Sequence, residues 1–240
     1  MLKEYKVWDR TTRIFHWVNF LCVLVLSVLG AMILYGSSFG ATVDGRNFLK
    51  VLHSYVGYIF AINLAWRLVW GFIGGPYARW RAVLPVGSGY GAQVAGELKD
   101  ISSGRKANYL GHSPLGRIAA TALLLLLLVE AGTGLVLSGT DVYMPPFGKA
   151  IATWVAADGV DPSQVRPNAP ETVNPVAYKE MRSMRGPYAQ THTTLFYVLL
   201  GLIALHIFAV VMTDVKRGGN IISAMFSGRK TLSEPPADPH

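Results

Sequence analysis

The sequence predicts an all-α integral membrane protein, a bundle of four transmembrane helices with both termini in the cytoplasm. The composition indicates a membrane protein, because 51% of the 240 residues are hydrophobic and only 15% are charged, whereas soluble domains carry about 25% charged residues. Four long apolar segments supply the expected helices. The basic residues, which gather on one side of these segments, set the orientation.

A helix needs about 20 mostly apolar residues to cross the hydrocarbon core, and four segments meet this requirement. Lipid offers the backbone no hydrogen-bond partners, so each segment is expected to be helical. The expected spans are residues 14–36, 48–73, 115–138 and 190–213. We treat residues 1–230 as a single transmembrane domain and residues 231–240 as a disordered tail.

Each span has its own justification. The first follows a basic stretch, as a signal peptide does, but it is longer than a signal h-region and carries His16 at its start, so we expect it to remain a span. The second is somewhat more polar. The third contains the uninterrupted apolar run 123–129, and the fourth is apolar over 195–212 and is expected to begin near Gln190.

The distribution of charge predicts the orientation. Most of the 22 basic residues lie in the N-terminal tail, in the loop between the second and third spans, and in the C-terminal tail. The positive-inside rule therefore places both termini in the cytoplasm. The loop of residues 139–189 then faces outward, and its many prolines predict only brief regular structure.

Composition also excludes several classes of protein. The single cysteine, Cys22, excludes an internal disulfide framework, a CxxC redox pair and a cysteine-based zinc or iron–sulfur site. The net charge of +8 follows from membrane topology, so we expect membrane lipid and no nucleic acid as a partner.

Four histidines lie in or at the ends of the spans, where ionisable side chains are costly and are candidates for function. His16 lies near the cytoplasmic face, whereas His53 and His192 lie near the outer face. His206 follows His192 by fourteen residues, which is about 21 Å along a helix and nearly the same side of it. This spacing predicts two levels, His53 with His192 outside and His16 with His206 inside.

Two imidazoles at one depth on different helices can ligate a haem iron from both faces. Both axial positions are then filled, which favours electron transfer over activation of a substrate. Zinc suits two distant pairs poorly, because it prefers four nearby ligands. Interfacial polar histidines and a histidine proton relay remain open as alternatives.

Other polar residues flank the histidines. Arg46 and Lys50 lie near the outer pair and Arg13 near the inner pair, where they could bind haem propionates or simply contact lipid headgroups. Glu130 lies well inside the third span, where an ionised carboxylate is costly. It is either a proton or quinol contact or a neutral acid hydrogen-bonded between helices.

Several motifs carry a resemblance to a known family. They are Arg-x-x-His-Trp at residues 13–17, Gly-His-x-Pro-Leu at residues 111–115, and the histidines at positions 53, 192 and 206. In these residues the chain resembles the prokaryotic four-helix di-haem cytochromes b. This cytochrome b(561)-like group includes the cytochrome b subunit of membrane-bound nickel–iron hydrogenases.

The resemblance implies two haem b groups, bound by His16, His53, His192 and His206, in a multi-pass protein of the bacterial inner membrane. It also implies exchange of electrons between the quinone pool and a redox partner. The stretch Trp8-Asp-Arg-Thr-Thr looks closer to stand-alone relatives that work with c-type cytochromes, so a periplasmic c-type cytochrome is the expected partner.

The alternative is a cytochrome b subunit that anchors a nickel–iron hydrogenase or another periplasmic oxidoreductase. A cofactor-free anchor ranks lower, because it would leave the paired histidines without a role. A proton or ion transporter that uses Glu130 and the histidines also ranks lower, and it predicts transport that depends on Glu130 with no absorption of visible light. The sequence leaves open whether the chain is itself an enzyme.

Overall fold

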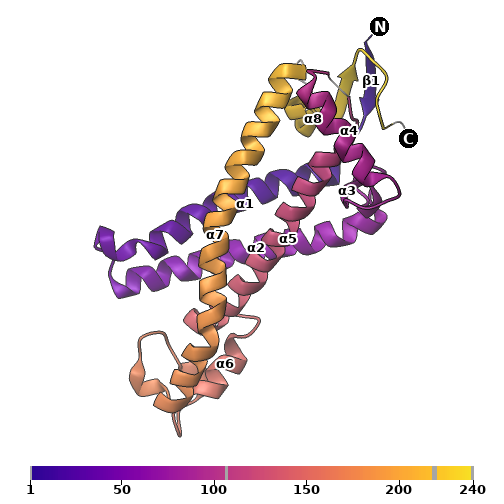
Figure 1. Ribbon diagram of the computed structural model, residues 1–240. Helices are drawn as coiled ribbons and strands as arrows, with labels where there is room; N and C mark the ends of the chain where they lie inside the picture. The colour runs from indigo at the N-terminus through magenta and orange to yellow at the C-terminus, as the bar shows by residue number, and fades with distance from the viewer. Residues whose placement is uncertain (1, 106–107, 218–220, 239–240) are drawn as a thin grey trace. The chain divides into compact units, whose positions relative to one another are not determined.

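The computed structural model describes residues 2–105, 108–217 and 221–238. Four of its helices are long and apolar enough to cross a membrane (Figure 1). They are α1 (Arg10–Leu34), α2 (Val43–Ile73), α5 (Pro114–Val142) and α7 (Pro175–Arg217). The predicted all-α integral membrane architecture is therefore confirmed.

The fourth long helix, α7, begins fifteen residues before the expected span, at Pro175. Asn174 caps it, because its Oδ1 accepts hydrogen bonds from the backbone N–H groups of Val176 (3.0 Å) and Ala177 (3.2 Å). Proline fits the first position of a helix, where its missing N–H has no intrahelical partner to lose. Pro187 lies inside the helix without ending it. Part of the expected outer loop is thus helical.

The chain forms two compact units, and each long helix contributes residues to both. One unit contains Met1–Trp17, Leu64–Leu126 and Leu199–His240. Its shorter elements are β1 (Lys3–Lys6), α3 (Trp80–Val83), α4 (Tyr90–Ser102), α8 (Ile221–Ser227) and β2 (Arg229–Leu232). β1 and β2 pair antiparallel beside α8 (Figure 1). A buried cluster of Val7, Trp8, Tyr77, Leu110, Ala224 and Leu232 packs beneath them. We call this the terminal unit.

Part of the segment 231–240, which is expected to be a disordered tail, lies in contact with other residues of the terminal unit. Lys230 in β2 is buried, and its Nζ donates to the carbonyl oxygens of Tyr109 and Leu110. Farther along, the Asp238 carboxylate accepts hydrogen bonds from the backbone N–H groups of Leu110 and Gly111. These contacts hold residues 231–238 in place, and residues 239 and 240 lie outside the described residues.

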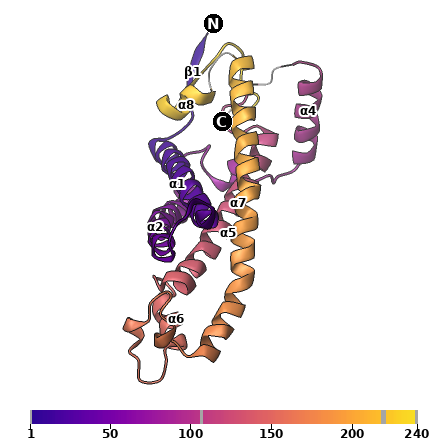
Figure 2. The same cartoon turned by 90° about the vertical axis from the view of Figure 1, so that its left-hand side faces the viewer.

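The other unit contains Val18–Asn63 and Leu127–Val198, and we call it the central unit. The 3-10 helix η1 (Gly36–Phe39) lies between α1 and α2. The segment between α5 and α7 folds into α6 (Gly148–Val155), η2 (Pro162–Gln164) and η3 (Pro170–Thr172). This segment lies beside the first turns of α7 (Figure 2) and packs around Val155 and Met181, which are fully buried.

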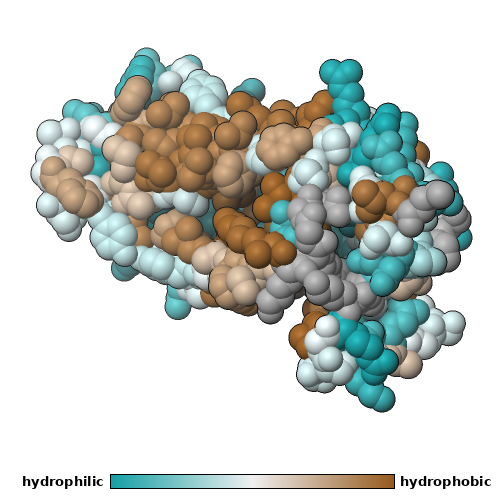
Figure 3. All heavy atoms as spheres, turned by 90° about the horizontal axis from the view of Figure 1, so that it is seen from above, coloured by the Kyte–Doolittle hydropathy of each residue, from teal (hydrophilic) through white to brown (hydrophobic). Residues whose placement is uncertain are grey.

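The long helices expose many large apolar side chains. In α1, for example, Leu21, Leu24 and Val28 are each more than half exposed, at 56%, 52% and 54%. Hydrophobic side chains cover a wide part of the face drawn in Figure 3. Soluble proteins rarely expose such contiguous apolar surface, so lipid is the solvent that these helices face.

Candidate functional site

The central unit brings His53 of α2 and His192 of α7 together. Their ring centroids lie 6.2 Å apart, with the ring planes at 76°. A metal–imidazole nitrogen bond is about 2 Å long, so two imidazoles that hold one metal ion from opposite sides have centroids about 6 Å apart. The observed spacing fits a single metal ion between the two rings.

His192 is oriented by a hydroxyl group on α5. Thr133 Oγ1 lies 3.0 Å from His192 Nδ1, and it donates its own hydrogen to the carbonyl oxygen of Val129 at 2.9 Å. When Nδ1 carries the ring hydrogen of His192, the hydroxyl oxygen can accept it. This tautomer leaves the Nε2 lone pair for a metal ion, which is the usual arrangement around a metal-bound histidine.

His53 has the complementary feature. Its Nδ1 is buried and has no hydrogen-bond partner among the described residues. Buried polar atoms are nearly always paired, so an unpaired ring nitrogen beside a second imidazole fits a site that a bound group completes. Gly134 belongs to the same site, because a Cβ at this position would lie only 3.2 Å from the His192 ring.

Glu130 lies one turn before Thr133 on α5, beside the same histidine. Its Oε1 is 3.4 Å from His192 Nδ1, and its side chain is 15% exposed. The second carboxylate oxygen, Oε2, is buried without a partner among the described residues. The structure thus places this acid against the histidine pair rather than elsewhere in the span.

The two basic residues predicted near this pair have different surroundings. Lys50 Nζ forms an ion pair with Asp141 at 3.0 Å, and Arg185 of α7 forms hydrogen bonds to the same carboxylate. Arg46 instead packs its aliphatic stem against Gly36. Sequence reasoning missed Asp141, which lies near the end of α5, and Arg185, which lies two turns before His192 on α7.

The terminal unit contains His16 of α1 and His206 of α7. The Nδ1 of His16 is buried without a hydrogen-bond partner in the described part of the chain. His16 packs edge-on against Trp17, with ring centroids 5.5 Å apart. Trp17 Nε1 in turn donates to the carbonyl oxygen of Met225 at 3.1 Å, which fixes the start of α1 to α8.

Arg13 and Arg67 lie in the same unit as His16 and His206. Arg13 donates to the carbonyl oxygen of Phe226, while its Nε is buried without a partner among the described residues. Arg67 of α2 is only 7% exposed. Its guanidinium lies 5.0 Å from the ring centroid of Trp80 and 5.9 Å from that of Phe15, the neighbour of His16.

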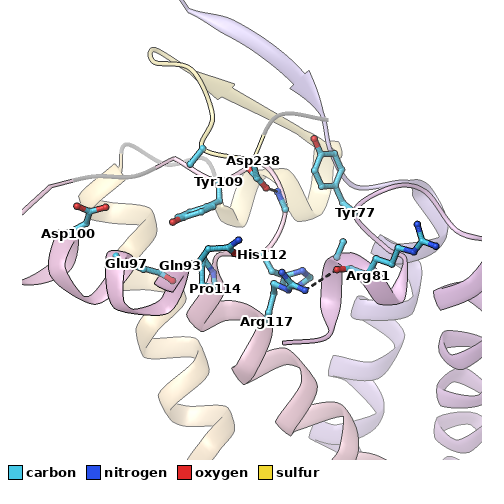
Figure 4. A pocket seen from close by; sticks show the side chains of 14 residues that line it. Tyr77, Arg81, Gln93, Glu97, Asp100, Tyr109, His112, Pro114, Arg117 and Asp238 are labelled. Atoms are coloured by element: carbon cyan, nitrogen blue, oxygen red, sulfur yellow. Dashed lines mark hydrogen bonds between the residues drawn. The ribbon is translucent and has the colours of Figure 1, made fainter. Parts of the chain in front are cut away.

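His112 lies in the turn that leads into α5. It lines a cavity of about 470 Å³ together with Tyr109 and Arg117 (Figure 4), and its ring packs edge-on against Trp8 at 5.1 Å. Burial and then the nearby charge of Lys230 lower the pKa of His112 to about 4. It is therefore neutral at pH 7, and it has no paired imidazole as His53 does.

Comparison with known proteins gives a consistent result. A family model described as prokaryotic cytochrome b561 matches residues 7–228. A probable Ni/Fe-hydrogenase B-type cytochrome subunit of Cupriavidus necator is 26% identical over 97% of this chain and 89% of that protein. The subunit of the same name from Rhizobium leguminosarum bv. viciae is 25% identical over 95% of this chain and 89% of that protein. No solved structure matches significantly.

Proposed function

The chain belongs to the prokaryotic cytochrome b561 family, and from this membership we propose that it binds two haem b groups and passes electrons between membrane quinone and a redox partner. It is a multi-pass protein of the bacterial inner membrane and a b-type cytochrome. The number of haems, the quinone and the partner are the parts that we propose.

The observation that carries the proposal is the pair His53 and His192, whose ring centroids lie 6.2 Å apart. In this pair, His192 Nδ1 lies 3.0 Å from Thr133 Oγ1. Haem b, when bound, supplies an iron that accepts and releases one electron. His53 and His192 would hold one such iron, and His16 and His206 the other. With two histidines to hold each iron, the chain would conduct electrons rather than activate a substrate.

The positive-inside rule supports an orientation with both termini in the cytoplasm. In that orientation His53 and His192 lie near the periplasmic face, where a c-type cytochrome could exchange electrons with the chain. The names of the relatives support a second candidate, a cytochrome subunit of a nickel–iron hydrogenase or another periplasmic oxidoreductase. Glu130 would serve as a proton or quinol contact, and Arg13 and Arg46 as propionate partners.

Electron transfer can be tested directly in vesicles that contain the purified protein. A quinol analogue should reduce the haem, and an added oxidised c-type cytochrome should reoxidise it. The variant His53→Ala should slow the second step. Haem that responds to neither reagent would contradict the proposal, whereas haem that responds only with a co-purified hydrogenase would favour the second candidate.

The hydroxyl of Thr133 gives a separate prediction. Thr133→Val keeps the shape of the side chain but removes the acceptor for His192 Nδ1–H. Loss of such a partner costs about 10–100-fold in metal affinity, so haem should be lost selectively from this site during dilution and repeated purification. The matched control is Thr153→Val in α6, where the hydroxyl donates only to the carbonyl oxygen of Lys149. Equal retention in both variants would contradict the predicted orientation of His192.

A further inference from the structure

The central unit contains a cluster of charges that the sequence did not reveal. The Asp141 side chain is only 8% exposed, and three basic groups surround it. Lys50 Nζ lies 3.0 Å from Oδ2, Arg182 Nη1 lies 3.7 Å from Oδ1, and Arg185 contacts both oxygens, with Nη2 at 2.7 Å from Oδ2. We call these four residues the Asp141 cluster.

The charges of the Asp141 cluster do not balance. Three cations share one carboxylate, and no second acid forms an ion pair with any of them within the described residues. Lys50 and Arg185 are largely covered, with side chains 30% and 19% exposed. Charges that are partly withdrawn from water need partners to offset the cost of desolvation. The cluster therefore carries a surplus of two positive charges, which two anionic groups would neutralise.

The position of the cluster relates it to the histidine pair. Lys50 precedes His53 by three residues on α2, and Arg185 precedes His192 by seven residues on α7. These separations are about one and two helical turns, so each cation lies on the same face of its helix as the histidine. Asp141 follows Thr133, the partner of His192, by eight residues on α5. All three helices thus present the cluster on one side of the pair.

We propose that the Asp141 cluster binds the two propionates of the haem held by His53 and His192, an inference that rests on the proposed function. The two propionates of haem b are carboxylates on one edge of a flat macrocycle. Their two negative charges match the surplus of the cluster, and the arginine forks suit carboxylate oxygens. Asp141 orients the basic side chains, and Lys50, Arg182 and Arg185 contact the propionates.

A comparison of haem b with its dimethyl ester, which has no free carboxylates, tests this assignment. The full-length chain carrying His206→Ala, which retains only the outer site, is stripped of haem and titrated with each compound. With the cluster intact, haem b should bind at least about tenfold more tightly than the ester, the loss expected for a single charge-assisted hydrogen bond. In Lys50→Gln/Arg185→Gln this ratio should fall toward one.

Two further variants make the result decisive. Lys179→Gln, an exposed position on the same helix, should leave the ratio unchanged. If Lys50→Gln/Arg185→Gln does not fold, Arg182→Gln serves instead, because its 3.7 Å contact is the longest in the cluster, and it should lower the ratio by a smaller factor.

The outcomes separate this inference from the proposed function. If haem b and its dimethyl ester bind the intact cluster equally well, the inference is wrong, and the cluster only connects the helices. If phospholipid also co-purifies with the chain but not with Lys50→Gln/Arg185→Gln, the cluster is a site for lipid phosphate. A ratio that stays high in Lys50→Gln/Arg185→Gln would also overturn the inference. Failure of the otherwise unchanged full chain to bind haem b at all would instead contradict the proposed function.

Discussion

Replacement of His53 by alanine is expected to remove one of the two haems and leave the other in place. His53 would hold the iron of the proposed outer haem, and its Nδ1 has no hydrogen-bond partner among the described residues, so its replacement breaks no hydrogen bond at that nitrogen. His192→Ala should have the same effect. The pyridine haemochrome assay should give about one haem per chain in either variant.

His112→Asn is the control for these variants. This residue lines the cavity of the terminal unit and has no paired imidazole, so the variant should retain two haems. Retention of both haems in His53→Ala would mean that the pairing of His53 with His192 is wrong. Loss of a haem in His112→Asn would mean that a ligand has been missed.

Double variants test the pairing itself, and their expected effects are the largest of all. His53→Ala/His192→Ala removes both ligands of one proposed haem and should retain one haem per chain. His53→Ala/His206→Ala removes one ligand from each proposed haem and should retain none, because each iron would keep a single axial histidine. The two proteins carry the same number of substitutions, so each controls for the loss of stability in the other.

The haem content of the two double variants can be compared at equal protein concentration, with circular dichroism to verify that both remain helical. Equal haem content in the two would contradict the assignment of His53 with His192 and of His16 with His206. Haem in His53→Ala/His206→Ala together with none in His53→Ala/His192→Ala would indicate that His53 pairs with His206 and His16 with His192.

The four spans could be predicted because they depend on a local pattern, whereas the two histidine levels remain a prediction. An apolar run of about 20 residues identifies a span, and the fourteen residues between His192 and His206 fix their separation on one helix. The structure brings His53 and His192 together, as the depth argument predicts. The start of α7 was also encoded locally, in the pair Asn174–Pro175, but the prolines of the outer loop obscured it.

The remaining features depend on contacts between residues distant in sequence. β1 and β2 pair across more than two hundred residues, and a four-residue strand has too short a pattern to indicate its partner. Lys230 counts as a cytoplasmic charge in the sequence, yet it is buried against the Tyr109 and Leu110 carbonyl groups. In the sequence, Asp141 is only an acidic residue near the end of a predicted span. Its three basic neighbours come from α2 and α7 and are seen only when these helices pack together.

The most direct test of the central claim is the dithionite-reduced minus oxidised visible spectrum of the detergent-purified full chain, with the haem-to-protein ratio from the pyridine haemochrome assay. We predict a sharp b-type α-band and about two haems per chain. About one haem per chain would contradict the second site and leave one histidine pair with a structural role. Protein that contains no haem, although purified from cells well supplied with it, would contradict the proposal that this chain conducts electrons through two histidine-ligated haems.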